Sequence, residues 1–302
     1  MVDEAPFRRL YPYKGRYFQR GPWRLHFLDE GRGEPVLALH GNPTWSFFYR
    51  QLVPALSDRC RLIIPDHLGC GLSDVPPPAR YGYRLADRID DLEALLEHLG
   101  LAEGLTFVLH DWGGPIGLGY AARHPARLSR LILLNTAAFV SPRGWRLPRP
   151  LALFRRPWIG PILALGFNAV ARGAARTAAR RRLPAEVLEG YLAPYNRPSR
   201  RVALLRFIQD IPLGTADVSF PLLEEIERSL VHLRRIPVLI CWGGRDFIFD
   251  APFLARWQEL LPEAEVRIFP EAGHYLLEDA AVEVLARMRE FLTRTAPVEA
   301  VR

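Results

Sequence analysis

The residues best suited to chemistry lie in the pentapeptide His110-Asp111-Trp112-Gly113-Gly114. An apolar run before it, Leu105 to Leu109, predicts a buried strand, and the glycine- and alanine-rich stretch Gly113 to Arg123 predicts a helix. A sharp turn between strand and helix lifts a side chain to the top of a sheet. The alternative for an aspartate after a strand is a helix N-cap. We expect Asp111 to be a nucleophile, because a carboxylate is already anionic and can attack saturated carbon to form an alkyl ester.

A second carboxylate and a histidine follow further along the chain. The run Ile236 to Trp242 predicts another buried strand, and Asp246 lies in the loop after it. A shorter strand is predicted over Ala264 to Phe269, and His274 comes next on a glycine-bearing loop. The order nucleophile, acid, base matches a known catalytic arrangement. We predict that His274 is the base that activates water against the ester, and that Asp246 fixes its tautomer and stabilises the imidazolium.

Several other polar residues at strand ends have a structural interpretation. His40, His67 and His110 also lie at strand ends, and His40 and His110 stand next to glycine or acidic turn residues, where a histidine commonly satisfies loop backbone groups. Because a base must also have an orienting partner, we expect these histidines to be structural. Asp66 looks like a residue that organises a turn. Asp250 is the rival of Asp246, but it lies just before a predicted helix and is better explained as an N-cap.

A second motif, His40-Gly41-Asn42-Pro43-Thr44-Trp45, follows a predicted strand over Pro35 to Leu39. Such a loop supplies one backbone N–H of an oxyanion hole, and the residue after the nucleophile, Trp112, supplies the other. The side-chain amide of Asn42 and the indole of Trp112 add neutral donors. Each hydrogen bond to a departing anion is worth roughly 1.5–3 kcal/mol. The alternative is that Asn42 only shapes its loop and Trp112 only packs.

The elements that position these residues alternate between strand and helix from Phe27 to Asn135 and again from Ile236 to Phe291. This alternation predicts an α/β fold with a mostly parallel sheet and helices on both faces. Between the two halves, proline, arginine and aromatic residues crowd a helical segment. We therefore expect a core formed by 1–140 and 233–302, and a helical cap over 141–232 above the carboxyl ends of the strands.

Both motifs resemble the signatures of the haloalkane dehalogenases, a family with the α/β-hydrolase fold. The resemblance implies that Asp111 is the nucleophile and that Asn42 and Trp112 hold the leaving halide. One large subgroup carries a glutamate just after the sixth strand, but Leu131 to Phe139 contains no carboxylate. Asp246 must then serve as the acid, as in the third dehalogenase subgroup.

Four further segments are similar to the β-lactone decarboxylases of bacterial long-chain olefin biosynthesis: Leu134 to Phe139, Tyr191 to Asn196, Arg206 to Pro212 and Ala272 to Ala280. Asn196 departs from that pattern, in which we expect aspartate. The resemblance implies a cis-disubstituted β-lactone as substrate and a cis-olefin and carbon dioxide as products. It implies no cofactor. Attack by Asp111 at the ring carbon and attack at the lactone carbonyl both remain open.

Three other functions compete with this interpretation. A haloalkane dehalogenase would use the same catalytic residues. An epoxide hydrolase would need acidic phenols from the cap, and Tyr191 and Tyr195 stand at helical spacing. A catalytically silent binding module has no need of Asp111, Asp246 and His274 together.

The composition of the chain indicates which partners and which cellular compartment to expect. The three cysteines, at positions 60, 70 and 241, show no metal-ligand spacing, and with the N-terminus Met1 to Ala5, which lacks a signal pattern, they favour a cytoplasmic protein without a metal. The apolar stretch Trp158 to Val170 is too short to span a bilayer. The net charge is +7, and much of it lies in Arg172 to Arg182. We interpret that run first as a solvated helix face and second as a contact for a membrane or a partner protein, such as another enzyme of an olefin pathway. Nothing predicts nucleic-acid binding.

Overall fold

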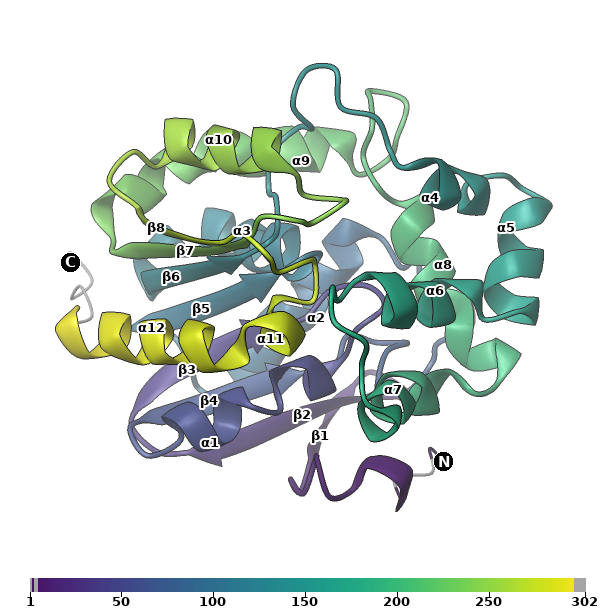
Figure 1. Cartoon of the computed structure of the whole chain (residues 1–302), viewed down its shortest axis with the longest axis horizontal. Coiled ribbons are helices and arrows are strands. Elements are labelled where there is room, and N and C mark those ends of the chain that lie inside the picture. Colours follow the sequence, from purple (N-terminus) through teal and green to yellow (C-terminus); the bar gives the residue numbers. More distant parts are fainter. Residues whose placement is uncertain (1, 3–4, 296–302) are drawn as a thin grey trace.

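An eight-stranded sheet forms the centre of the molecule, as seen in the computed structural model, which describes residues 2 and 5–295 (Figure 1). The strand order is β1-β2-β4-β3-β5-β6-β7-β8. β1 and β2 run antiparallel to their neighbours, whereas β4, β3 and β5 to β8 are parallel, which confirms the predicted fold class. The strands are β1 (Arg16–Arg20), β2 (Trp23–Gly31), β3 (Glu34–Leu39), β4 (Cys60–Pro65), β5 (Leu105–His110), β6 (Leu128–Leu134), β7 (Val238–Gly243) and β8 (Glu265–Phe269).

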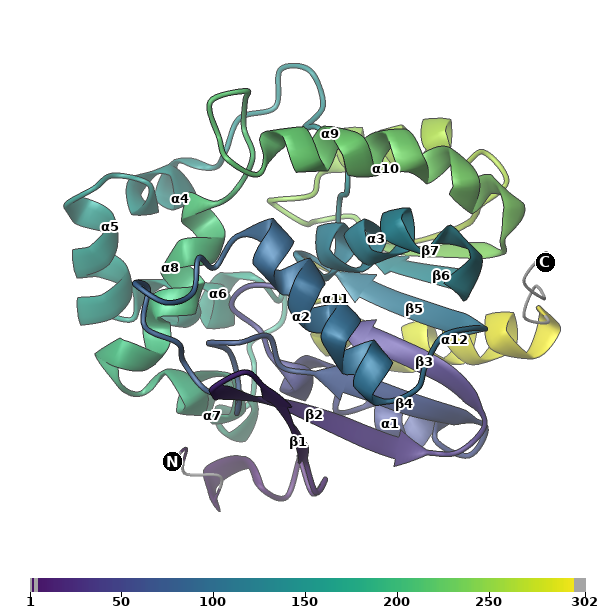
Figure 2. The ribbon, with the colours of Figure 1, turned by 180° about the vertical axis from the view of Figure 1, so that it is seen from behind.

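Helices cover both faces of the sheet because its central strands are apolar on both sides. In β3, Val36 and Ala38 face one hydrophobic cluster, while Leu37 and Leu39 face the other, as the two-residue period of a strand requires. Figures 1 and 2 show the two faces in turn. The first cluster includes α1 (Leu52–Leu56), α11 (Leu276–Asp279) and α12 (Ala281–Arg294); the second includes α2 (Leu85–His98), α3 (Gly113–Arg123) and α10 (Ala251–Leu260).

The segment between β6 and β7 is helical and extends beyond one end of the sheet (Figure 1). Its last long helix packs along α3 of the core. The boundaries of a separate cap, at 141 and 232, stay a prediction. The segment contains α4 (Arg149–Phe154), α5 (Ile159–Pro161), the π-helix η4 (Ile162–Gly166), α6 (Ala169–Thr177), α7 (Ala185–Leu192), α8 (Val202–Gln209) and α9 (Phe220–Ser229), with 3-10 turns η5 (Ala193–Tyr195), η6 (Pro198–Arg201) and η7 (Leu230–Arg235).

In the part of the chain that the structure describes, no helix has the length and apolar character needed to cross a membrane. Met1, Asp3 and Glu4, on which the expectation of no export signal partly rests, lie outside the described residues. Three further 3-10 turns, η1 (Ala5–Phe7), η2 (Ser46–Tyr49) and η3 (Pro125–Arg127), complete the elements.

A buried ion pair ties this helical segment to the core. Arg50, just after η2, donates two hydrogen bonds of 2.6 and 2.9 Å to the carboxylate of Glu278 in α11. The hydroxyl of Tyr191 in α7 donates to the same carboxylate at 2.5 Å. Burial opposes the guanidinium charge, but Glu278 and Tyr191 outweigh that effect and raise the pKa of Arg50. The contact joins three distant segments.

We therefore predict that Glu278→Gln destabilises the fold by about 3 kcal/mol, because it leaves the buried Arg50 charge without a counter-ion. Urea denaturation measures the change. Asp58→Asn is the matched control, since it breaks the exposed pair with Arg289 and should leave the unfolding midpoint unchanged. Equal effects of the two substitutions would contradict the special weight of the buried pair.

Candidate active site

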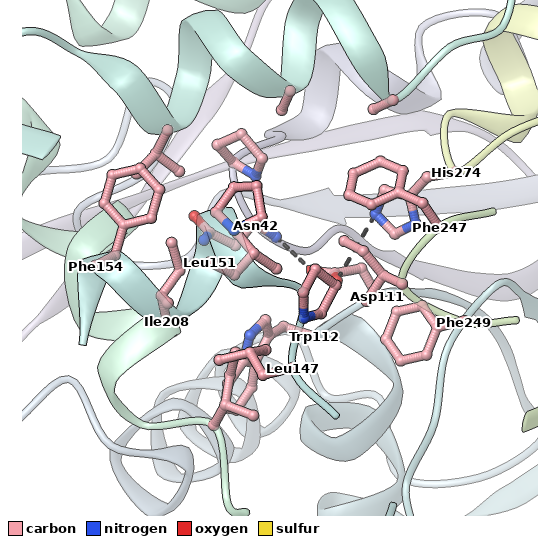
Figure 3. A pocket seen from close by; sticks show the side chains of 18 of the residues that line it. Asn42, Asp111, Trp112, Leu147, Leu151, Phe154, Ile208, Phe247, Phe249 and His274 are labelled. Atoms are coloured by element: carbon pink, nitrogen blue, oxygen red, sulfur yellow. Dashed lines mark hydrogen bonds and ion pairs between the residues drawn. The ribbon is translucent and has the colours of Figure 1, made fainter. Parts of the chain in front are cut away.

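The predicted site residues meet at the carboxyl ends of the parallel strands. Asn42 follows β3 and Asp111 follows β5, and these neighbouring strands form the point where the order of the sheet reverses. Asp246 follows β7 and His274 follows β8. Figure 3 shows Asn42, Asp111, Trp112 and His274 around one cavity. The sequence motifs are thus brought together by the sheet.

Asp111 occupies a strained turn between β5 and α3. Its φ of +50° lies in the left-handed region that a non-glycine residue seldom adopts. The turn is held by the carbonyl of Asp111, which accepts hydrogen bonds from the N–H of Gly114 at 3.0 Å and from the hydroxyl of Thr136 at 2.5 Å. Gly113 is required by close approach, because a Cβ there would lie 2.1 Å from the carbonyl oxygen of Leu39.

The two oxygens of the Asp111 carboxylate have different surroundings. Oδ1 accepts the backbone N–H of Asn42 at 2.6 Å, and a Cβ on Gly41 would come within 1.9 Å of it. Oδ2 lies 3.8 Å from Nε2 of His274. Burial raises the pKa of Asp111, although His274 and the backbone N–H groups of Asn42 and Trp112 oppose the shift. One oxygen is therefore fixed by the backbone, while the other faces the histidine across a gap.

His274 is oriented by Asp246. Its Nδ1 lies 2.8 Å from Oδ2 of Asp246, while the other oxygen of that carboxylate accepts the N–H groups of Ile248 and Phe249. Nε2 of His274 is buried and has no hydrogen-bond partner among the described residues. Burial lowers the pKa of His274, but the carboxylates of Asp246 and Asp111 outweigh it and the net shift is upward. The ring therefore presents a free nitrogen to Oδ2 of Asp111.

Asp250, the rival for this place, stands at the N-cap position of α10 with an exposed side chain. Its side chain makes no capping hydrogen bond. The geometry thus favours Asp246, and the predicted N-cap position agrees with the structure.

Asn42 and Trp112 both line the cavity. The side-chain amide of Asn42 donates to the carbonyl of Leu204 in α8 at 3.1 Å, which fixes the amide and leaves its second N–H free. The ring of Trp112 packs against Phe207, with 5.2 Å between centroids. No protein group in the described part of the chain accepts its indole N–H. Two neutral donors are therefore available near the nucleophile.

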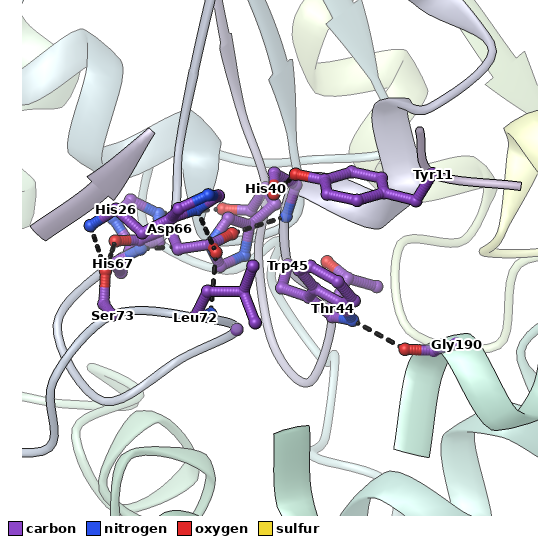
Figure 4. A network of polar contacts seen from close by, with 12 residues as sticks. Tyr11, His26, His40, Thr44, Trp45, Asp66, His67, Leu72, Ser73 and Gly190 are labelled. Carbon is purple, nitrogen blue, oxygen red and sulfur yellow. Dashed lines mark hydrogen bonds and ion pairs between the residues drawn. The ribbon is translucent and has the colours of Figure 1, made fainter. Parts of the chain in front are cut away.

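His40, His67 and His110, the other histidines at strand ends, contact backbone groups of loops, as the sequence predicts. Figure 4 shows the buried network around Asp66, whose carboxylate accepts the N–H of Ser46 at 2.7 Å and contacts Nδ1 of His26 at 2.8 Å. Nε2 of His40 accepts the N–H of His67, and its Nδ1 lies 2.8 Å from the carbonyl of Gly41. Burial lowers the pKa of His40 to about 4, so its ring is neutral. This network holds the loop that carries Asn42.

Two supporting residues, Asn135 and Asp279, were missed by the sequence analysis, whereas His110 takes the structural role that it predicts. Nε2 of His110 lies 2.9 Å from the carbonyl oxygen of His274 and holds the backbone of that residue. Asn135 exchanges two hydrogen bonds with Gly243 and so fixes the loop before Asp246. Asp279 accepts the N–H of Gly273. A polar residue at the end of β6 was a usable signal for Asn135, whereas the partners of His110 and Asp279 depend on tertiary contacts.

The cavity above Asp111 has a volume of about 510 Å³, and its wall is almost wholly apolar. Asp111 and His274 are the only ionisable side chains among the described residues that line it. Tyr191 and Tyr195 are buried elsewhere, on Glu278 and on the carbonyl of Thr44, and do not reach it. The phenols that an epoxide hydrolase would need are thus absent from this wall. No cluster of three or more metal-ligating side chains occurs within residues 2 and 5–295.

Comparisons with known proteins agree with this geometry. A family model described as alpha/beta hydrolase fold matches residues 34–281. A cis-3-alkyl-4-alkyloxetan-2-one decarboxylase of Shewanella oneidensis is 47% identical over 95% of this chain and 90% of its own length. A protein of the same name from Xanthomonas campestris is 45% identical over 89% of this chain and 92% of its own length. The chain belongs to the haloalkane dehalogenase-like family of α/β hydrolases.

Haloalkane dehalogenases themselves are more distant within this family. Haloalkane dehalogenase 2 of Mycobacterium tuberculosis is 31% identical over 96% of this chain and 98% of its own length. The crystal structure of the haloalkane dehalogenase DatA of Agrobacterium tumefaciens superposes with a TM-score of 0.85 at 24% identity, over 94% of this chain and 97% of that one. The family fold therefore extends over nearly the whole chain.

The geometry around His274 yields a prediction on protonation. Asp246→Asn should lower the pKa of His274, because it removes the carboxylate that offsets the effect of burial. Nitrogen-15 NMR titration of the imidazole, assigned with His274→Gln, measures the pKa. Asp250→Asn is the control and should leave it unchanged. A His274 pKa that responds to Asp250 and not to Asp246 would reverse the assignment of the acid.

Proposed function

We propose that this enzyme decarboxylates cis-3,4-dialkyl β-lactones to cis-olefins and carbon dioxide, with Asp111 as its nucleophile. The observation that carries the proposal is a carboxylate at the base of an apolar cavity, with Oδ1 held by the backbone N–H of Asn42 and Oδ2 facing Nε2 of His274 at 3.8 Å. The 45–47% identity to two proteins named as oxetan-2-one decarboxylases supports the same substrate class.

In the first step, Oδ2 of Asp111 bonds to the ring carbon that carries the lactone oxygen. The carbon–oxygen bond breaks, and its electron pair leaves on the new carboxylate. The indole N–H of Trp112 and the free amide N–H of Asn42 are suited to receive that anion, as they would a halide. Inversion occurs at the attacked carbon.

In the second step, the carbon–carbon bond to the carboxylate breaks and carbon dioxide leaves. Its electron pair forms the double bond as the bond between carbon and Asp111 breaks, which regenerates the aspartate. Anti elimination after inversion returns the cis geometry. The apolar wall disfavours the localised negative charge of the substrate carboxylate. When the ester bond breaks, the negative charge returns to the Asp111 carboxylate, which two backbone N–H groups stabilise. The cavity therefore favours loss of carbon dioxide.

Attack at the lactone carbonyl, which gives an anhydride, is the rival first step. Carbonyl attack would need donors around the carbonyl oxygen, but the backbone N–H groups of Asn42 and Trp112 already address the Asp111 carboxylate. This favours attack at the ring carbon. His274 and Asp246 then serve to hydrolyse any ester that carries no carboxylate to lose, such as one formed from a haloalkane.

We also propose that the enzyme works in the cytoplasm. Its three cysteines are free and buried, which fits the reducing cytoplasm. We expect an apolar electrophile as substrate, delivered by other enzymes of an olefin-forming pathway.

Product analysis tests the proposal. Purified enzyme given a cis-3,4-dialkyl β-lactone should release the cis-olefin, while 1-bromobutane and 1,2-dibromoethane should release halide at a far lower rate. Gas chromatography and halide assay provide the measurements, with Asp111→Ala as the inactive control. Halide release without olefin would make the chain a haloalkane dehalogenase and overturn the proposal.

The proposed anion-holding pair yields a second prediction. Trp112→Phe should lower kcat about tenfold to a hundredfold, from the roughly 1.5–3 kcal/mol of a hydrogen bond to a charged group, because the donor is lost while most of the ring remains. Asn42→Ala should act similarly. Steady-state kinetics measures both.

Trp145→Phe is the matched control, since Trp145 lines the same cavity but packs edge-on against Phe253 and does not follow the nucleophile in the chain. It should alter KM more than kcat. Trp112→Phe with an unchanged kcat would show that Trp112 only packs.

A further inference from the structure

The outer surface of the helical segment carries an unusual cluster of exposed apolar side chains. Trp158 is 85% exposed, Ile162 59% and Phe167 66%, and all three lie within ten residues, just before α5, on η4 and just after η4. Trp158 and Ile162 are four residues apart in helical geometry and therefore share one face. Such large side chains seldom gather on a surface that meets only water.

The charge around this cluster has a single sign. Residues 141–185 contain ten arginines and no aspartate, glutamate or lysine, so their charge of +10 exceeds the +7 of the whole chain. Among the described residues, only Arg155 of these ten pairs with a carboxylate, that of Asp217. Arg172 and Arg176 are exposed one turn apart on α6. The unpaired arginines leave a strong positive field beside the apolar side chains.

This surface is continuous with the wall of the cavity. Leu153 is 45% exposed and also lines the cavity, and Leu163 of η4 lines it from beside the exposed Ile162. The inner side of α6 adds Gly173 and Ala174 to the cavity wall, while its outer side carries the exposed arginines. Figure 1 shows α4, α5 and α6 together at one end of the molecule. An apolar path thus leads from the surface toward Asp111.

We propose that this tip, residues 149–182, docks on an anionic lipid bilayer. Trp158, Ile162 and Phe167 would insert into the interface, and the flanking arginines would meet the lipid phosphates, the pattern by which peripheral proteins bind anionic membranes. The one-signed and unpaired charge favours this occupant over a protein partner, whose interface would have to match each arginine separately. Docking would place the mouth of the cavity against the bilayer. Entry of an alkyl-chain substrate by this route rests on the proposed function; the binding itself does not.

Flotation of the full-length protein with vesicles tests the binding. We expect it to float with vesicles of two-thirds phosphatidylcholine and one-third phosphatidylglycerol, to float poorly with pure phosphatidylcholine, and to be released by salt. Arg172→Gln with Arg176→Gln should weaken the partition roughly 25-fold, at about fivefold for each arginine near an anionic surface. The triple change of Trp158, Ile162 and Phe167 to alanine should abolish it.

Matched controls lie at the other end of the molecule, in the segments that precede β3 and β7. Arg32→Gln with Arg235→Gln removes the same charge from exposed positions, and Val231→Ala removes an exposed apolar side chain. All three should leave binding unchanged. Brominated lipid should quench tryptophan emission of the wild type and not of Trp158→Phe.

Activity separates this proposal from the proposed function. The tip variants should decarboxylate a short, water-soluble β-lactone at the wild-type rate, and should lose rate only with a long-chain lactone dissolved in anionic vesicles. Absence of flotation at either lipid composition, or flotation that the tip variants and the controls change equally, would overturn the docking surface. A tip that serves an acidic protein partner would give the first of these results. If the wild type formed no olefin from the soluble lactone, that result would instead refute the proposed function alone.

Discussion

The hydrogen bond from the backbone N–H of Asn42 to Oδ1 of Asp111 is the contact on which the site depends. A carboxylate buried in an apolar wall is costly unless donors compensate its charge, and burial here already raises its pKa. Because the donor belongs to the backbone, the bond fixes one oxygen and directs the other toward His274. Gly41 makes the approach possible, since any side chain there would overlap Asp111.

The surrounding structure keeps this contact in place from several sides. Asp66 and His40 anchor the loop of Asn42, as Figure 4 shows, and Trp45 of that loop donates its indole N–H to the carbonyl of Gly190 in α7. The loop of His274 is held in turn by His110 and by Asp279, which also accepts the backbone N–H groups of Arg180 and Arg181. The helical segment is therefore bonded to both catalytic loops, so its packing and the alignment of the proposed nucleophile are linked.

Much of this architecture was predictable from local patterns. Helix α3 has the predicted bounds, and β3, β5, β7 and β8 lie within two residues of the expected strands, because apolar runs and glycine turns mark them strongly. Asn42, Asp111, Asp246 and His274 were foreseeable for the same reason, since each lies in the loop after such a strand, at most five residues beyond its end.

What the sequence did not provide depends on side chains that meet only in three dimensions. Tyr191 was considered as an acid for an epoxide, yet it donates to Glu278 and does not line the cavity, because helical spacing predicts a shared face and not the direction that face takes. Asn135 and His110 support the catalytic loops through partners more than a hundred residues away. The free N–H of Asn42 likewise depends on Leu204 in α8.

The claim that Asp111 attacks carbon is tested most directly by trapping its ester. His274→Gln should block hydrolysis but not alkylation, and a long-chain 1-iodoalkane provides no carboxylate to lose, so the ester should accumulate. Peptide mass spectrometry after acid quench measures it. The account predicts that the peptide containing Asp111 gains the mass of the alkyl group in His274→Gln and not in His274→Gln with Asp111→Asn. An unmodified Asp111 peptide, from a protein whose wild type converts β-lactone to olefin, would contradict it.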